Sequence, residues 1–213
     1  MKSPSTNDID QQLETWKSCE KCQLHVFRTQ VVLGSGNSTD PKIMIIGQSP
    51  GETEDKEGKP FVGKVSWHLN QALKASKINR EQDCYVTNSV VCRPWIPSSN
   101  RNIPPSMNSL KHCRERLLLE YNRIKNSVEA IVLVGKEAYI AWHMHEQMAE
   151  PSFNPARVRM GDVIGWSTGL DKIKTYTVYH PSYIARQGKA EIARRWLNNW
   201  IEISSSVFPE RFS

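Results

Sequence analysis

The apolar residues of this chain follow two different periods. Short, almost continuous apolar runs rich in Ile, Val and Tyr predict buried strands, at residues 42–46, 85–91, 130–134 and 174–179. Longer segments in which apolar residues recur every three or four positions predict helices, at residues 8–18, 65–77, 106–124, 136–147 and 189–203. Asp8, at the start of the first of these segments, is the expected N-cap of its helix.

Strands that alternate with long helices favour a parallel sheet covered on both faces. We therefore predict an α/β fold with three layers, α/β/α, around a central four-stranded, mainly parallel sheet. The chain of 213 residues is long enough for one substantial core, so residues 1–213 are treated as a single domain. Residues 149–170 are rich in Pro and Gly and are expected to form a surface excursion.

Polar sequences stand at the ends of three predicted strands, at residues 47–51, 88–94 and 180–182. In parallel α/β sheets, ligands bind at the carboxyl ends of the strands. We therefore expect these three loops to meet in one crevice.

The composition narrows the class of protein. Only 38% of the residues are apolar, and no apolar stretch approaches the roughly 20 residues that a membrane-spanning helix needs. The N-terminus has no hydrophobic signal segment, so we expect a cytoplasmic monomer that does not enter a membrane. The net charge of +6 favours a polyanionic partner, and seven tryptophans would suit stacking on bases.

The cysteines form a pattern that points to a metal centre. Cys19 and Cys22 make a C-x-x-C pair, while Cys92 and Cys113 lie far apart later in the chain. In a reducing compartment such a set binds metal more often than it forms disulfides. A redox pair or a zinc site stays possible, although zinc sites usually use two close pairs. The fifth, Cys84, is expected to be a buried thiol at a strand edge.

Several motifs follow one another along the chain: Cys19-x-x-Cys22, Gly47-Gln48-Ser49-Pro50-Gly51, Gly58-Lys59-Pro60-Phe61-Val62-Gly63, Thr87-Asn88 with Cys92-Arg93-Pro94, and His180-Pro181-Ser182-Tyr183. In this order they resemble the iron–sulfur (family 4) branch of the uracil-DNA glycosylase superfamily, over residues 12–202. The resemblance implies one glycosylase-like domain whose N-terminal cysteine pair belongs to an iron–sulfur site. It also implies a structural [4Fe-4S] cluster, which four thiolates can hold, at Cys19, Cys22, Cys92 and Cys113.

The resemblance also implies a DNA glycosylase that flips a nucleotide out of DNA and hydrolyses its N-glycosidic bond. The base would be uracil or a modified pyrimidine, and an abasic site would remain. Phe61 would stack on the base, Asn88 would read its edge with an amide donor and acceptor, and His180 would stabilise the departing anion. Gln48 falls in the motif that handles the attacking water, and Ser49 beside it would contact the substrate.

Further positions follow from the same resemblance. Ser182, Tyr183 and Arg186 would lie on a loop that presses into the duplex where the base departs. Lys64, Arg93 and Arg101 are candidates for phosphate contacts.

The chain departs from the family motif around the expected base pocket. Gln48 stands where the motif has Glu, and a neutral amide cannot take a proton, although it can hold a water. Loss of a general base typically costs about 10²–10⁴ in rate. Val65-Ser66-Trp67 replaces the usual Ala-Gly-Gln, which should reshape one pocket wall. The departures leave a second hypothesis open, a catalytically weak DNA-binding module that recruits replication or repair proteins.

Overall fold

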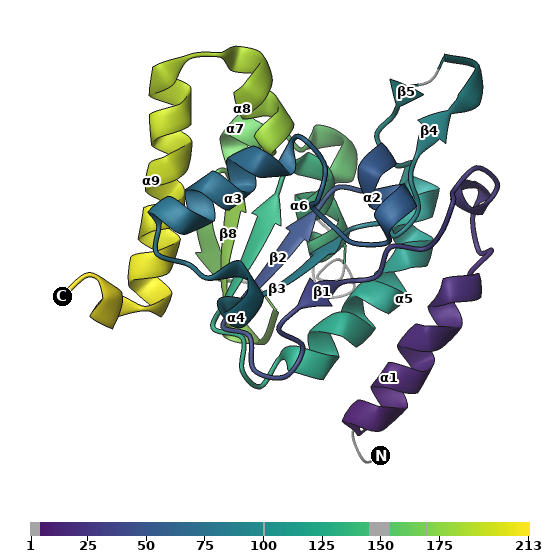
Figure 1. The fold of residues 1–213 in the computed structure, drawn as a ribbon, viewed down its shortest axis with the longest axis horizontal. Coiled ribbons are helices and arrows are strands. Elements are labelled where there is room, and N and C mark those ends of the chain that lie inside the picture. Colours follow the sequence, from purple (N-terminus) through teal and green to yellow (C-terminus); the bar gives the residue numbers. More distant parts are fainter. Residues whose placement is uncertain (1–4, 100, 145–153, 169) are drawn as a thin grey trace.

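The computed structural model describes residues 5–99, 101–144, 154–168 and 170–213. At its centre is a six-stranded sheet with the order β1-β3-β2-β6-β8-β7 (Figure 1). The inner strands are parallel and correspond to the predicted strands: β2 (Ile43–Gly47), β3 (Cys84–Asn88), β6 (Ala130–Val134) and β8 (Lys174–Val178). The predicted α/β class and mainly parallel sheet are therefore confirmed.

The prediction of four strands is wrong, because the sheet has a further strand at each edge. β1 (Ser35–Gly36) and β7 (Gly165–Thr168) pair antiparallel with β3 and β8. β1 is only two residues long, and every residue of β7 is exposed, so neither has the apolar pattern of a buried strand. β7 also lies inside residues 149–170, where a surface excursion was expected.

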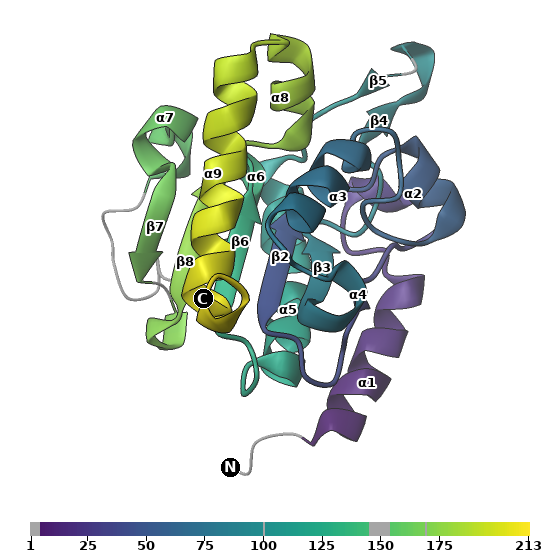
Figure 2. The ribbon, with the colours of Figure 1, turned by 60° about the vertical axis from the view of Figure 1, so that its left-hand side comes forward.

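Helices cover both faces of the sheet, as the three-layer prediction required. Alternate side chains of a strand point to opposite faces: Met44 and Ile46 of β2 enter one apolar core, and Ile43 and Ile45 enter the other. The first core contains residues of α5 (Met107–Ile124) and α6 (Lys136–His143). The second contains residues of α3 (Ser66–Ala75), α8 (Pro181–Gln187) and α9 (Ala190–Val207). Figure 2 shows α3 and α9 on the same side of the sheet.

Shorter elements complete the described part of the chain. α1 (Thr6–Thr15) packs against α5, and the β4 (Trp95–Ile96) and β5 (Arg101–Asn102) hairpin projects at the same end of the molecule as α8 (Figure 1). The remaining helices are α2 (Glu52–Glu57), α4 (Arg80–Asp83) and α7 (Met160–Val163). No described helix is long and apolar enough to cross a membrane.

Some predicted boundaries move for local reasons. Ser5, not Asp8, is the N-cap of α1, because the Ser5 hydroxyl accepts from the Asp8 backbone N–H at 3.3 Å; the Asp8 carboxylate accepts from the Ser5 N–H at 2.9 Å and completes a capping box. β3 ends at Asn88 rather than residue 91, because Ser89 turns back and its N–H and hydroxyl both donate to the Gly47 carbonyl. α6 ends at His143, and residues 145–147 of its predicted span lie outside the described residues.

The segment after β8 is a helix, whereas a loop was predicted there. His180 caps α8, Pro181 occupies its first turn, and Gly188 ends it in the left-handed conformation with φ +59°. Proline just inside the start and glycine just past the end are established helix signals. With only seven residues, the helix is too short for apolar periodicity to reveal it.

Candidate active site

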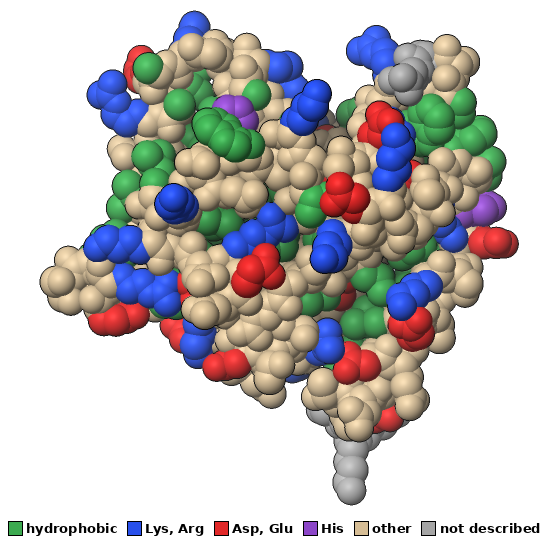
Figure 3. Space-filling model, in the orientation of Figure 1, with side chains coloured by type: hydrophobic (Ala, Val, Ile, Leu, Met, Phe, Trp, Pro, Cys, Tyr) green, Lys and Arg blue, Asp and Glu red, His purple; other side chains and the backbone are tan. Residues whose placement is uncertain are grey.

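The carboxyl ends of β2, β3 and β8 open into a cavity of about 710 Å³. It lies between α8 and the β4–β5 hairpin, and Figure 3 shows the notch between these two projections. Seven of the eight predicted catalytic and substrate-binding residues line it: Gln48, Ser49, Phe61, Asn88, His180, Ser182 and Arg186. The three loops that the sequence predicted to converge therefore do so.

Tyr183 does not line the cavity. Its ring stacks on Tyr179 with centroids 4.5 Å apart, and both rings pack against the second core. Ser182 and Arg186 are four residues apart and share a face of α8, while Tyr183 lies on a different face of the same helix. Because this segment is a helix and not a loop, Tyr183 points away from the cavity that Ser182 and Arg186 line.

Asn88 forms the floor of the cavity, at the end of β3 and opposite Gly47 in the sheet register. A Cβ at Gly47 would lie 2.4 Å from both the Asn88 Oδ1 and the Phe61 Cζ, so only glycine lets the amide and the ring approach this closely. Asn88 is 2% exposed, yet its side-chain amide makes no hydrogen bond to any described residue. The amide faces the cavity, where its donors and its acceptor are left for a ligand.

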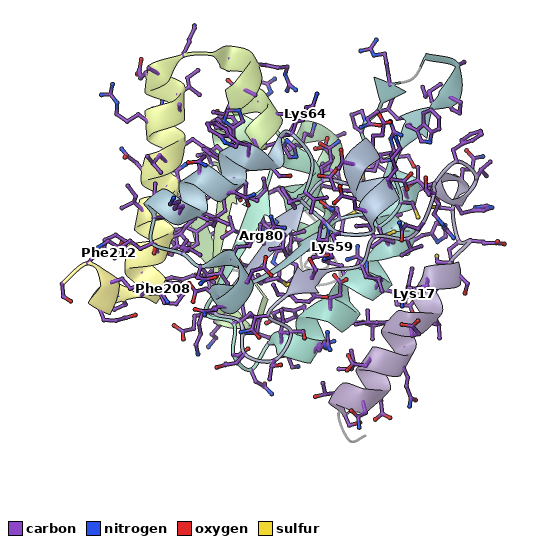
Figure 4. The ribbon with its side chains drawn as sticks, in the orientation of Figure 1. Lys17, Lys59, Lys64, Arg80, Phe208 and Phe212 are labelled. Carbon is purple, nitrogen blue, oxygen red and sulfur yellow. The ribbon has the colours of Figure 1, made fainter. Side chains whose placement is uncertain are left out.

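Phe61 is held beside this amide by a strained loop. Its φ is +54°, in the left-handed region that a bulky residue rarely adopts. The Arg80 guanidinium donates to the Phe61 carbonyl at 2.8 Å and to the Pro60 carbonyl at 2.7 Å. Figure 4 labels Arg80 at the centre of the face it draws. Two charge-assisted hydrogen bonds to adjacent carbonyls keep the strained turn in place.

Glu54 fixes the other side of the same loop. Its carboxylate accepts hydrogen bonds from the backbone N–H groups of Gly63 at 2.8 Å, Val62 at 3.2 Å and Gly51 at 3.1 Å. Glu54 lies on α2 and lines the cavity. Its spacing from Gly51 is that of a capping box and could have signalled the helix; no sequence pattern singles out Arg80.

His180 faces the cavity as a neutral imidazole. The Ser182 backbone N–H can only donate, and it lies 3.2 Å from the His180 Nδ1, so Nδ1 accepts and Nε2 carries the proton. The Ser182 hydroxyl lies 2.8 Å from the same Nδ1. Burial and, to a lesser extent, the charge of Arg186 together lower the pKa of His180 to about 4, against an opposing effect of Glu54. At neutral pH the ring is therefore an uncharged donor.

Gln48 follows β2 and lines the cavity with its side chain half-buried. The side-chain amide makes no hydrogen bond to any residue in the described part of the chain, while the Gln48 carbonyl accepts from the Val90 N–H at 3.4 Å. The backbone is thus tied to the segment after β3, and the amide is left for a water or a substrate.

The three predicted phosphate contacts have different surroundings. Lys64 and Arg101 are exposed, and Figure 4 labels Lys64 near the top of the face where the cavity opens. Arg93 is buried: its Nε donates to the Asn102 Oδ1 at 2.8 Å, and its guanidinium lies 4.6 Å from the Trp95 ring centroid. Arg93 therefore braces the β4–β5 hairpin, and its phosphate contact stays a prediction.

The four predicted cluster cysteines converge on one side of the first core. Cys92 and Cys113 are buried within that core, and Leu24, two residues after Cys22, packs against it. Burial, with smaller effects of Cys113 and Cys22, raises the pKa of the Cys92 thiol to about 11, although Arg28 opposes the rise. Cys19 and Cys22 act in the same direction on the pKa of Cys113, so the thiols lie near one another.

The surroundings of these cysteines bear on the kind of metal centre that they could hold. Among the described residues no group of three or more His, Cys, Asp or Glu could hold a single metal ion. A four-iron cluster binds each thiolate to a different iron and so needs its sulfurs farther apart than one ion does. Arg28 donates to the Cys92 Sγ at 3.3 Å and to the Cys19 carbonyl, a donor that suits an anionic thiolate site. Cys84 is buried at the start of β3, as predicted.

Comparisons with known proteins agree with the site. A model of the Uracil DNA glycosylase superfamily matches residues 33–201. The type-4 uracil-DNA glycosylase of Thermotoga maritima is 37% identical over 181 residues, which are 85% of this chain and 85% of that protein. Those of Saccharolobus solfataricus (31% identical, 83% of this chain and 76% of that protein) and Archaeoglobus fulgidus (30%, with 78% of each) are similar at lower identity.

Proposed function

Because this chain belongs to the uracil DNA glycosylase superfamily, we propose that it hydrolyses the N-glycosidic bond of uracil in DNA and leaves an abasic site. The observation that carries the proposal is the buried Asn88 amide, which lines the cavity without a hydrogen-bond partner among the described residues. An amide offers one acceptor and two donors side by side. It can accept from the uracil N3–H and donate to O4.

The flipped base enters the cavity between Phe61 and the loops at the strand ends. As the glycosidic bond breaks, negative charge moves onto the base, and the Nε2–H of the neutral His180 donates to the base oxygen O2. A fixed donor aimed at developing charge typically contributes about 10²–10³ in rate. Gln48 holds the attacking water through its amide and takes no proton, so the proton that the water loses on bonding to C1′ passes to the departing base anion. In this mechanism, leaving-group stabilisation supplies more of the rate than base catalysis does.

Uracil is the first substrate we propose, and a modified pyrimidine is the second. Val65 lines the cavity at a position where the family motif has a small residue, so one wall differs from that motif. The Asn88 amide, if rotated by 180°, would also match cytosine. Base selection therefore depends on what holds Asn88 in one orientation.

The proposed cofactor is a [4Fe-4S] cluster held by Cys19, Cys22, Cys92 and Cys113. When bound, it ties the N-terminal segment to α5 and to the loop after β3. The burial of Cys92 and Cys113, the packing of Leu24 and the hydrogen bond from Arg28 to Cys92 support this site.

DNA is the proposed partner, lying across the notch between α8 and the β4–β5 hairpin. Lys64, Arg101 and Arg186 are exposed around it, and phosphate contacts from such residues make binding salt-dependent. Arg186 lies on the same face of α8 as Ser182, and both line the cavity, which supports this placement of the DNA.

The test uses duplexes that carry uracil, hydroxymethylated or glucosylated pyrimidines, followed by alkaline cleavage at abasic sites. We expect cleavage at uracil, lost in Asn88→Ala. The second candidate function, a DNA-binding module without excision, is favoured by the neutral Gln48 alone. Binding of every duplex without cleavage of any of them would support that module and contradict the glycosylase.

A further inference from the structure

A buried ion pair lies directly behind the base-reading residue. Arg116 and Glu120, one turn apart on α5, have fully buried side chains, and the Arg116 Nη1 donates to the Glu120 Oε2 at 2.6 Å. The Arg116 Nη2 donates to the backbone carbonyls of Asn88 at 2.7 Å and Ser89 at 3.1 Å. The Nη1 also donates to the Thr87 hydroxyl at 3.0 Å. Three of the four contacts of Arg116 thus fall on three consecutive residues.

Stability alone does not explain this pair. Burying two charges costs several kcal/mol of desolvation, and apolar residues of similar volume are often as good or better. The surrounding core between α5 and the sheet is apolar, with Leu110, Leu117 and Tyr121 on the same helix. A planar guanidinium, however, presents several donors in a fixed geometry. The pair therefore contributes fixed hydrogen-bond donors that hold the backbone of residues 87–89 in one conformation.

That backbone needs donors at this point. β3 ends at Asn88, where the chain turns out of the sheet and its carbonyls lose their strand partners. Arg116 donates to these carbonyls from α5, while Ser89 donates to the Gly47 carbonyl through its N–H at 2.8 Å and its hydroxyl at 2.7 Å. The residue that carries the base-reading amide is therefore fixed from two sides.

Glu120 in turn fixes Arg116. One oxygen of its carboxylate pairs with Arg116, and the other accepts from the Gly34 backbone N–H at 2.9 Å, on the segment that leads into β1. The carboxylate is therefore held by a second element and cannot rotate freely with the helix. A chain of hydrogen bonds runs from Gly34 through Glu120 and Arg116 to Asn88.

We propose that Arg116 and Glu120 are positioning residues: by fixing the backbone at Asn88 they set where its amide meets the base, and so the rate and the base preference of excision. The inference rests on the proposed function, since it concerns the same pocket. Neither side chain lines the cavity, so their effect passes through the Asn88 backbone. Loosening the pair should slow excision and weaken base discrimination without weakening the hold on DNA, which the rim residues provide.

The experiment compares Arg116→Lys, which keeps the charge but loses the planar fork, with the paired change Arg116→Met/Glu120→Leu, which removes both charges together. Misplacing a catalytic group by about 1 Å can cost roughly 10²-fold in rate. We expect kcat for uracil excision to fall by about 10- to 100-fold. The KM for DNA should stay near its wild-type value, free uracil should inhibit less strongly, and the preference for uracil over cytosine should shrink.

Arg211→Lys is the matched control. Arg211 makes a two-pronged ion pair with Asp83, at 2.6 and 3.0 Å, on the C-terminal segment far from the cavity. Figure 4 labels its neighbours Phe208 and Phe212 at that end of the molecule. The control should lower the melting temperature and leave kcat and base preference unchanged.

Two results would overturn the inference, each in a recognisable way. If the folded Arg116→Lys and paired variants keep wild-type kcat and base preference, the pair is structural only and the glycosylase proposal stands. If the wild-type protein excises no base at all, the glycosylase proposal falls and this inference with it. Should Arg116→Lys fail to fold, the paired variant decides the matter, because it leaves no buried charge unpaired.

Discussion

At Gln48 a single atom differs from the family motif, an amide nitrogen in place of a carboxylate oxygen. The side chain lines the cavity with no hydrogen bond to a described residue, so a carboxylate could occupy the same space. We predict that Gln48→Glu raises the single-turnover rate of uracil excision, by up to about 10²-fold, because it adds a base for the attacking water. A rate that is unchanged or lower would show that a carboxylate at this position does not activate the water.

His180 gives the site a pH dependence whose sign can be worked out. Its pKa is lowered from 6.5 to about 4, so between these values the unfolded chain binds this proton and the folded chain does not. The unfolding free energy therefore falls as the pH drops through this range, and the contribution is fully present above pH 6.5. In His180→Asn, which keeps a good N-cap for α8, denaturant unfolding should depend less on pH between these limits. Equal pH slopes in both proteins would contradict the assignment.

The roles of individual motif residues could be predicted because the residue type alone determines which groups a side chain can donate, accept or stack. Gln48, Asn88 and His180 do reach one cavity. The protonated nitrogen of His180 was not predictable, since it follows from a hydrogen bond with Ser182. The surroundings of Arg93 were not predictable for a similar reason, because the sequence does not show whether an arginine is solvated or, as here, bonded to Asn102.

At the scale of elements, the loop that carries Phe61 depends on a neighbouring helix. Arg80, at the start of α4, donates to the carbonyls of Pro60 and Phe61 and holds the positive φ of Phe61. We predict that Arg80→Met lowers kcat/KM for uracil about tenfold, since the stacking ring loses its fixed position. Glu81→Ala, which removes only an exposed contact 4.0 Å from Arg80, should leave kcat/KM unchanged. Similar values for both variants would contradict this role of Arg80.

Long elements were predicted well and short ones poorly. The four inner strands and the helices of the sheet faces have enough apolar residues to reveal their period. α2, α8, β1 and β7 are too short or too exposed for that, and only residues at their ends mark α2 and α8 in the sequence. The strain at Phe61 is also invisible in sequence, because the arginine that stabilises it is nineteen residues away.

At the scale of the whole molecule, the cysteines join segments that are distant in the chain. We predict that purified protein contains iron and sulfide and has a visible iron–sulfur absorption band. Cys92→Ala should lose the band and weaken the attachment of the N-terminal segment. Cys84→Ala is the matched control, because Cys84 is buried at the start of β3 and outside the proposed ligand set, so its iron content should be that of wild type. Stoichiometric zinc, or equal iron in both variants, would contradict the cluster.

The most direct test of the glycosylase proposal is single-turnover excision from a uracil-containing duplex by wild-type protein and by Asn88→Ala, with DNA affinity measured in parallel. We predict that wild type produces alkali-labile abasic sites at uracil. Asn88→Ala should lose at least about 10²-fold in rate and bind DNA with nearly unchanged affinity, because the rim holds the phosphates. Bound DNA without abasic sites in the wild type, or equal rates in the two proteins, would contradict the account.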